Sequence, residues 1–183
     1  TYIANPQILS DNKINQKGQR IFYTYTAIPQ SIGADSIPYI TIMQVNKVLT
    51  KEPVFVEDND AKDYGTDPIE ISGQSISKAH LNLRYTFLNG GNHLIPHSIS
   101  LLIAKDAQPD ARGYLSAELR HDAADDLQLN ANSGYVSFTL ENMPGFKEGT
   151  LKGFKIKTKT IKNETDIVEV TMNNNRKSMN FNI

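Results

Sequence analysis

The sequence contains no cysteine, and this absence excludes three kinds of chemistry. Disulfide bonds cannot stabilise the fold, thiolates cannot bind a metal ion, and no thiol can act as a nucleophile. The absence does not identify the compartment, because a chain without cysteine suits an oxidising periplasm and a reducing cytoplasm equally well.

Long apolar runs and an excess of positive charge are also missing. No stretch approaches the roughly 20 apolar residues that a membrane-spanning helix needs. The net charge of −1 provides no large positive field for nucleic acid or anionic lipid. The sequence begins at Thr1 without a visible signal peptide, which indicates either a processed product or a trimmed chain. We therefore expect no nucleic-acid partner.

Apolar and polar residues alternate along much of the chain with a period of two. HLNLRYTF (His80–Phe87), YVSFTL (Tyr135–Leu140) and GFKIKTKTI (Gly153–Ile161) follow this period, which is typical of strands with one buried and one solvated face. The predicted inward-facing residues of these three segments are Leu81, Leu83, Tyr85, Phe87, Val136, Phe138, Leu140, Phe154, Ile156, Thr158 and Thr160. Further strands are predicted at Arg20–Ile28, Ile37–Thr50, Pro68–Gln74, His97–Ala104, Tyr114–His121, Asp166–Met172 and Lys177–Ile183.

Turn residues separate these strands, and no segment has a convincing helical period. NGGN (Asn89–Asn92), PDARG (Pro109–Gly113) and NSG (Asn132–Gly134) contain the glycine, asparagine and aspartate that tight turns require. Many short strands with turns between them predict an all-β sandwich or barrel. An acidic stretch with two prolines, Glu52–Pro68, divides a short N-terminal group of strands from about seven later ones, the usual number for an immunoglobulin-like sandwich.

Four segments carry a family resemblance through their order and spacing. They are LNLRY (Leu81–Tyr85), HSISLLI (His97–Ile103), AELRHDAADD (Ala117–Asp126) and VSFTL (Val136–Leu140), and GQRIFYTY (Gly18–Tyr25) and NKVLTKEP (Asn46–Pro53) fit upstream of them. Together they resemble the NigD-like proteins of Bacteroidetes. The resemblance implies a partial OB-like barrel at residues 1–56, truncated at its start, followed by an immunoglobulin-like antiparallel β-sandwich at residues 57–183. It also implies a periplasmic or outer-membrane lipoprotein of the cell envelope, which associates with the membrane only through a lipid anchor upstream of this chain.

The segment GYLSAELRHDAADD (Gly113–Asp126) concentrates one histidine with several carboxylates. One hypothesis makes Glu118, His121 and Asp125 the ligands of a divalent ion or the acid–base group of a hydrolase. The other hypothesis is structural. The strand alternation then buries His121, which would bond to a backbone carbonyl, while the aspartates form the following turn. We favour the structural hypothesis and predict no catalytic residue, metal or cofactor.

Tyrosines of the N-terminal segment form a second candidate site. Tyr23, Tyr25 and Tyr39 can make a platform for a sugar or a peptide if they share one face of the barrel, although core packing explains them equally well. In addition, Ser36 lies in DSI, which matches the short pattern for O-glycosylation of exported Bacteroidetes proteins.

Basic and histidine-bearing stretches form two further candidates. Lysines at positions 155, 157, 159 and 162 make a stripe that can bind an anionic glycan or lipid head group, but we favour a role in keeping a solvated or edge strand from aggregating. His93 and His97 stand four apart, a metal-binding spacing only on a helix, and Pro96 between them favours a loop.

The predicted function is therefore a non-enzymatic binding or scaffolding module of the cell envelope with an unknown protein or glycan partner. Two alternatives stay open. One is a partner-binding protein of a bacteriocin, immunity or export system, since the family name derives from a bacteriocin-associated operon. The other is the metal- or carboxylate-dependent hydrolase centred on Glu118, His121 and Asp125.

Overall fold

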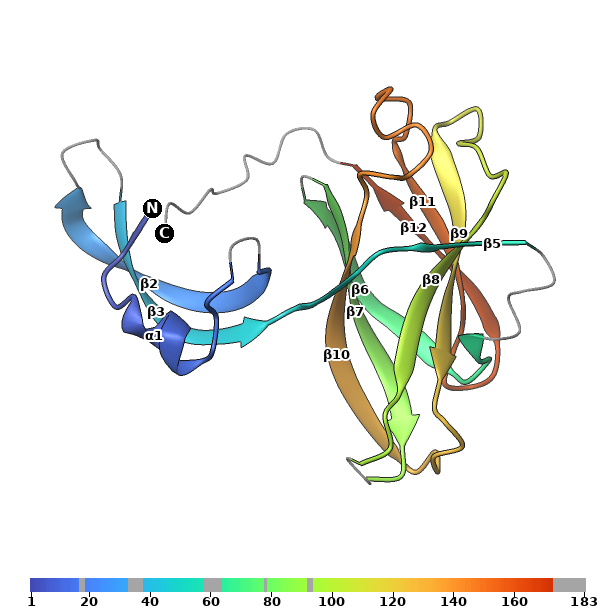
Figure 1. The fold of residues 1–183 in the computed structure, drawn as a ribbon, viewed down its shortest axis with the longest axis horizontal. Coiled ribbons are helices and arrows are strands. Elements are labelled where there is room, and N and C mark those ends of the chain that lie inside the picture. The colour runs from blue at the N-terminus through green and yellow to red at the C-terminus, as the bar shows by residue number, and fades with distance from the viewer. Residues whose placement is uncertain (17–18, 33–37, 58–63, 78, 92–93, 173–183) are drawn as a thin grey trace. The chain divides into compact units, whose positions relative to one another are not determined.

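The protein consists of two compact units that are built almost entirely from strands. A computed structural model describes residues 1–16, 19–32, 38–57, 64–77, 79–91 and 94–172. The first unit contains the chain up to Leu49, and the second begins at Thr50 (Figure 1). No helix among these residues is long and apolar enough to cross a membrane. The predicted strand Lys177–Ile183 and the serine at position 36 lie outside the described residues.

The first unit is a three-stranded sheet with one short helix. It contains β1 (Tyr2–Ile3), α1 (Gln7–Asp11), β2 (Ile21–Ile32) and β3 (Pro38–Lys47). The strand order is β1-β3-β2, so the sheet is open and does not close into a barrel over the residues described. Its small core consists of Leu9, Ile14, Ile40, Ile42 and Val45. The expected OB-like barrel is thus represented here by one open sheet.

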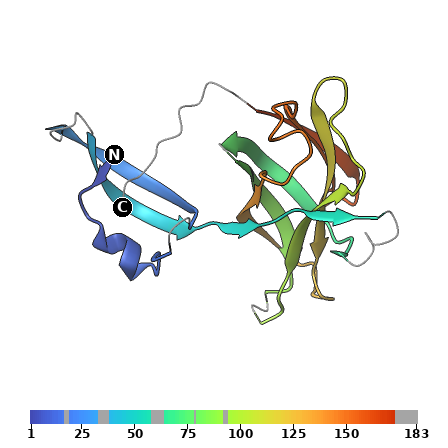
Figure 2. The same ribbon diagram turned by 45° about the horizontal axis from the view of Figure 1, so that its top comes forward.

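The second unit is a sandwich of two sheets, which Figures 1 and 2 show as two layers. The four-stranded sheet has the order β4 (Leu49–Lys51), β10 (Asn130–Thr139), β7 (His80–Asn89) and β6 (Ile69–Ser77). The five-stranded sheet has the order β12 (Thr165–Thr171), β11 (Gly153–Lys159), β9 (Tyr114–Asp122), β8 (Ser98–Ala104) and β5 (Val54–Val56). The predicted all-β sandwich is confirmed.

The five-stranded sheet is mixed rather than purely antiparallel. β11 pairs in parallel with β9, and β5 pairs in parallel with β8. Parallel neighbours need a long connection, and here the chain leaves β9, forms β10 in the opposite sheet and returns as β11. β11 therefore lies between β9 and β12, in the interior of its sheet.

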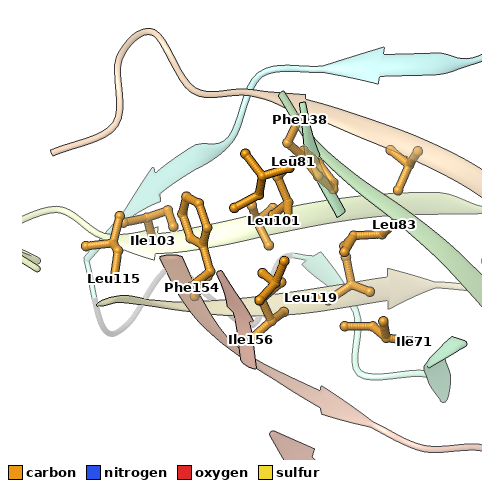
Figure 3. Packing of buried hydrophobic residues seen from close by; sticks show 14 of the residues in the cluster. Ile71, Leu81, Leu83, Leu101, Ile103, Leu115, Leu119, Phe138, Phe154 and Ile156 are labelled. Carbon is orange, nitrogen blue, oxygen red and sulfur yellow. The ribbon is translucent and has the colours of Figure 1, made fainter. Parts of the chain in front are cut away.

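The core lies between the two sheets, where the alternating apolar residues meet (Figure 3). Leu81, Phe138 and Phe154 are completely buried, and Leu119 is 1% exposed. Every predicted inward-facing residue except Phe87 and Thr160 is buried. Phe87 packs against the core while it is partly exposed, and Thr160, which follows the end of β11, is also partly exposed. The period-two alternation therefore identified the core face of β7, β10 and β11 correctly.

The position of Gly134 was predicted wrongly from the sequence. The segment NSG (Asn132–Gly134) was predicted to be a turn, but it lies inside β10, opposite β7. The ring of Tyr85 covers Gly134 so closely that a Cβ atom at this position would collide with the tyrosine hydroxyl. The glycine thus provides room for a neighbouring aromatic side chain instead of a positive φ.

Replacement of Phe138 by alanine tests the core. We expect the free energy of unfolding to fall by about 3–5 kcal/mol, because the substitution leaves a cavity between the sheets. Phe55→Ala is the matched control, since Phe55 is 38% exposed in β5 and should cost less than half as much. Urea denaturation followed by circular dichroism measures both. Equal losses for the two variants would contradict this placement of the core.

Candidate functional site

The three residues of the hydrolase hypothesis do not converge. Alternation along β9 places Glu118 on the outer, solvated face of the five-stranded sheet and His121 on the inner face, where it is 1% exposed. Asp125 lies in the turn after β9, exposed and with a φ of 61°. Over the described part of the chain, no group of three or more histidine, aspartate or glutamate side chains is arranged to hold a metal ion.

His121 instead belongs to a buried chain of hydrogen-bonded groups, which we call the histidine bridge. Its Nδ1 atom lies 3.0 Å from the carbonyl oxygen of Pro68, and its Nε2 atom lies 3.0 Å from Nδ1 of His97. Nε2 of His97 lies 3.1 Å from Oδ2 of Asp126. The ring of Phe87 packs against both imidazoles, with centroid distances of 5.2 and 5.4 Å. The bond from His121 to a backbone carbonyl is the one that the structural hypothesis expected.

Asp126 connects the histidine bridge to two loops. Its Oδ2 atom accepts a hydrogen bond of 2.8 Å from the backbone N–H of Gly90, and its Oδ1 atom accepts one of 2.9 Å from that of Leu127. The Gly90 N–H lowers the pKa of the Asp126 carboxyl, and the bonds from His97 and Leu127 lower it further against the opposing effect of burial. Asp126 is therefore a carboxylate at neutral pH.

Burial has the opposite consequence for the charge of His121. It lowers the pKa of His121, and the nearby His97 adds to this, while the Pro68 carbonyl and the carboxylates Asp67 and Asp122 oppose it. His121 is thus held neutral, with His97 between it and the ionised Asp126. The arrangement works as a structural bridge, since the imidazoles are bonded on both sides and neither has a nitrogen left for a substrate or a metal.

His97 and Asp126 were not among the predicted site residues. For His97, the sequence did contain a signal, namely the alternation of side-chain direction along a strand. Ile99 of β8 lies opposite His121 of β9, so His97, two residues before Ile99, lies on the same inner face. Two inward histidines at the ends of neighbouring strands can be expected to meet. Asp126 gave no such signal, because it lies in a turn rich in aspartate. The less favoured metal pair of His93 and His97 involves residue 93, which lies outside the described residues.

A second arrangement of polar residues lies on the outer face of the five-stranded sheet. An open groove of about 550 Å³ crosses the strands there, and we call it the outer groove. Its lining combines apolar and charged side chains: Val56, Leu102, Ala104, Ser116, Ala117, Glu118, Arg120, Lys155, Lys157 and Ile167.

Positive charges outnumber negative charges around Glu118 in the outer groove. Glu118 lies 3.1 Å from Nε of Arg120 and 3.5 Å from Nζ of Lys157, so one carboxylate serves two cations. Lys155 pairs with Asp110 at 2.6 Å, and this hydrogen bond, with backbone N–H bonds from Tyr114 and Arg112, lowers the pKa of Asp110 to about 2. Because Arg120 and Lys157 share the single carboxylate of Glu118, these three side chains have a net charge of one positive unit.

The lysine stripe belongs to this surface and not to a sheet edge. Lys155, Lys157 and Lys159 lie on β11, which has β9 on one side and β12 on the other. Protection of an edge strand therefore does not explain them, whereas the solvated face does. Lys159 donates a hydrogen bond of 3.1 Å to the carbonyl of Thr66.

The three tyrosines of the predicted platform do not share one face. The rings of Tyr23 and Tyr25 lie 5.8 Å apart, and Tyr23 packs against the small core of the first unit. Tyr39 precedes the inward-facing Ile40 and stacks on Tyr2 with a centroid distance of 5.2 Å. Because successive residues of a strand point to opposite faces, Tyr39 lies on the other side of the sheet from the core.

The fold and its interior define the second unit as a two-layer β-sandwich with a buried polar bridge and a charged groove. Residues 52–172 match the NigD-like C-terminal beta sandwich domain. The chain therefore belongs to the NigD-like family, as the order of its short segments indicated. Among curated proteins, no sequence matches it significantly.

Several solved structures have a similar fold. A protein of Parabacteroides distasonis described as toxin-related is 25% identical, with a TM-score of 0.70 over 96% of this chain and 80% of its own. A NigD-like immunity protein of Bacteroides caccae is 18% identical, with a TM-score of 0.60 over 82% and 71%. A protein of Bacteroides fragilis described as a lipoprotein is 10% identical, with a TM-score of 0.62 over 88% and 85%.

Two adjacent aspartates allow a matched test of the histidine bridge. Asp126→Asn removes the carboxylate that accepts from His97 and two backbone N–H groups, and we expect the melting temperature to fall by roughly 3–6 °C. Asp125→Asn should change it by less than about 1 °C, because asparagine tolerates the positive φ found there. Thermal unfolding at pH 7 measures both variants. Similar losses at the two positions would show that Asp126 is not a structural anchor.

Proposed function

We propose that this chain is a non-enzymatic, immunity-like protein that acts at the cell envelope by binding another protein. We further propose that the outer groove is the surface it uses. The observation that supports this most directly is the combination, on one open sheet face, of an apolar floor with charged side chains that are incompletely neutralised.

The chemistry of the outer groove suits a protein segment better than a small molecule. Sites for small molecules enclose most of their ligand, whereas this groove is open along the sheet. Leu102 on its floor is 3% exposed, while Ile167 at its side is 61% exposed. Apolar contact area next to an arginine and other charged groups is the usual composition of a protein interface.

The similar proteins support both the class of function and the location. One is an immunity protein of the same family, one is described as toxin-related, and one is described as a lipoprotein. Immunity implies that the partner is a protein whose action is blocked by binding. The divergence of Glu118, His121 and Asp125 supports a binding role over the hydrolase alternative.

A capture experiment with groove variants tests the proposal. The tagged chain is produced in its native cell, cross-linked and purified from the envelope fraction as wild type, as the double variant Lys157→Glu with Ile167→Asp, and as Lys147→Glu. Lys147 is an exposed lysine of the connection between β10 and β11, and its variant repeats the lysine-to-glutamate substitution away from the groove. We expect one protein to co-purify with the wild type and Lys147→Glu, and at least roughly tenfold less with the groove variant.

The captured protein then allows a test of immunity in cells. Cells that lack this chain should become sensitive to the captured protein, and the wild type should restore growth while the groove variant does not. Undiminished capture by a correctly folded groove variant would contradict the use of this surface. Growth that is unaffected by loss of the chain would contradict an immunity role.

A further inference from the structure

The histidine bridge ties the two sheets together at one end of the sandwich. Its first member, the Pro68 carbonyl, precedes β6 of the four-stranded sheet, and its two imidazoles belong to β9 and to the residue before β8 of the five-stranded sheet. Asp126 then accepts a hydrogen bond from the backbone N–H of Gly90, which directly follows β7, and this bond leads back to the four-stranded sheet. The bridge therefore crosses between the sheets twice.

The number of protons in the histidine bridge is fixed by its contacts. Three hydrogen bonds join the Pro68 carbonyl, His121, His97 and the Asp126 carboxylate, and both outer groups are acceptors. Three ring N–H protons are therefore needed on two imidazoles, which makes one neutral ring and one imidazolium. A fourth proton would either place two N–H groups against each other between His97 and His121 or neutralise Asp126. Removal of one proton would leave two acceptors facing each other.

From this proton balance we propose that the histidine bridge is an acid-sensitive connection, which holds this end of the sandwich together at neutral pH and opens when a fourth proton enters. The inference goes beyond the proposed function and does not depend on it. The segment released is the loop between β9 and β10, which carries Leu127 and Leu129, 65% and 69% exposed.

Acid is the direction that weakens the histidine bridge. The pKa of His121 is lowered in the folded protein, so between that value and the ordinary value of about 6.5 the unfolded chain binds the extra proton more readily. The contribution of His121 is therefore present above about pH 6.5 and is lost as the pH falls from there towards its lowered pKa, whereas loss of the third proton weakens the bridge at high pH. The lowered pKa of Asp126 acts in the same direction at still lower pH.

Few other charges face the imidazoles from the surrounding elements. Asp67, before β6, and Asp122, at the end of β9, favour protonation of His121 without reversing the effect of burial. Phe87 of β7 presents an apolar ring to both histidines. Arg120 of β9 points to the outer face, where it bonds to the carbonyl of Gly65.

Hydrogen–deuterium exchange of the intact chain at pH 7.0 and pH 5.5 tests the proposal. After correction for the intrinsic exchange rate, the amides of Gly90 and Leu127 should lose protection by about tenfold at pH 5.5, because both donate to Asp126. The amides of Leu101 and Val136 in the core should change by less than about twofold. Equal changes at all four amides, or none at Gly90 and Leu127, would overturn the proposal.

A histidine substitution provides the matched control. His97→Gln removes one of the two imidazoles of the bridge and should abolish the selective loss at pH 5.5, whereas His80→Gln, at the start of β7, should retain it. If His97→Gln does not fold, ¹⁵N spectra of the wild-type imidazoles give a separate answer. They should show three ring N–H protons on the pair at pH 7. Two neutral rings beside an ionised Asp126 would overturn the proton balance on which the proposal rests.

Discussion

The burial of alternating side chains between two facing sheets is the interaction on which the rest of the structure depends. Leu81, Phe138 and Phe154 are completely buried there, and no disulfide supplements them. Once these positions point inward, the intervening residues must point outward. The outer groove is the direct result, since Glu118 and Lys157 lie between inward-facing neighbours on adjacent parallel strands. The surface proposed for binding is thus set by the pattern that makes the core.

The same constraint explains why a polar bridge exists at the margin of the core. Alternation along β9 brings His121 to the inner face at the point where the strand ends, and a buried imidazole needs partners for both nitrogens. Pro68 and His97 supply them, and the carboxylate of Asp126 completes the chain. The aspartate-rich turn is therefore both the end of a strand and the anchor of two loops.

The local sequence pattern predicted which face of a strand each side chain occupies, but it did not predict which strands lie side by side. It placed Leu81 and His121 inside correctly, because side-chain direction depends only on the residue's position in the strand. It could not predict the ion pair of Glu118 with Lys157, since the chain passes through the opposite sheet between β9 and β11. His97 and Asp126 are 29 residues apart and meet only in the folded sheets. NSG was misread because glycine can make room for Tyr85 as well as a turn.

The interior position of β11 also has a consequence for synthesis. Until residues 153–159 leave the ribosome, β9 has an unpaired edge, and the side of the core that Phe154 and Ile156 cover stays open. Thr158 bonds to the carbonyl of Ile69, which lies 89 residues earlier in the chain. Contacts over such separations form late, so the nascent sandwich passes through a long interval in which a bare strand edge can pair with another chain. A chaperone that covers that edge would raise the yield of folded protein.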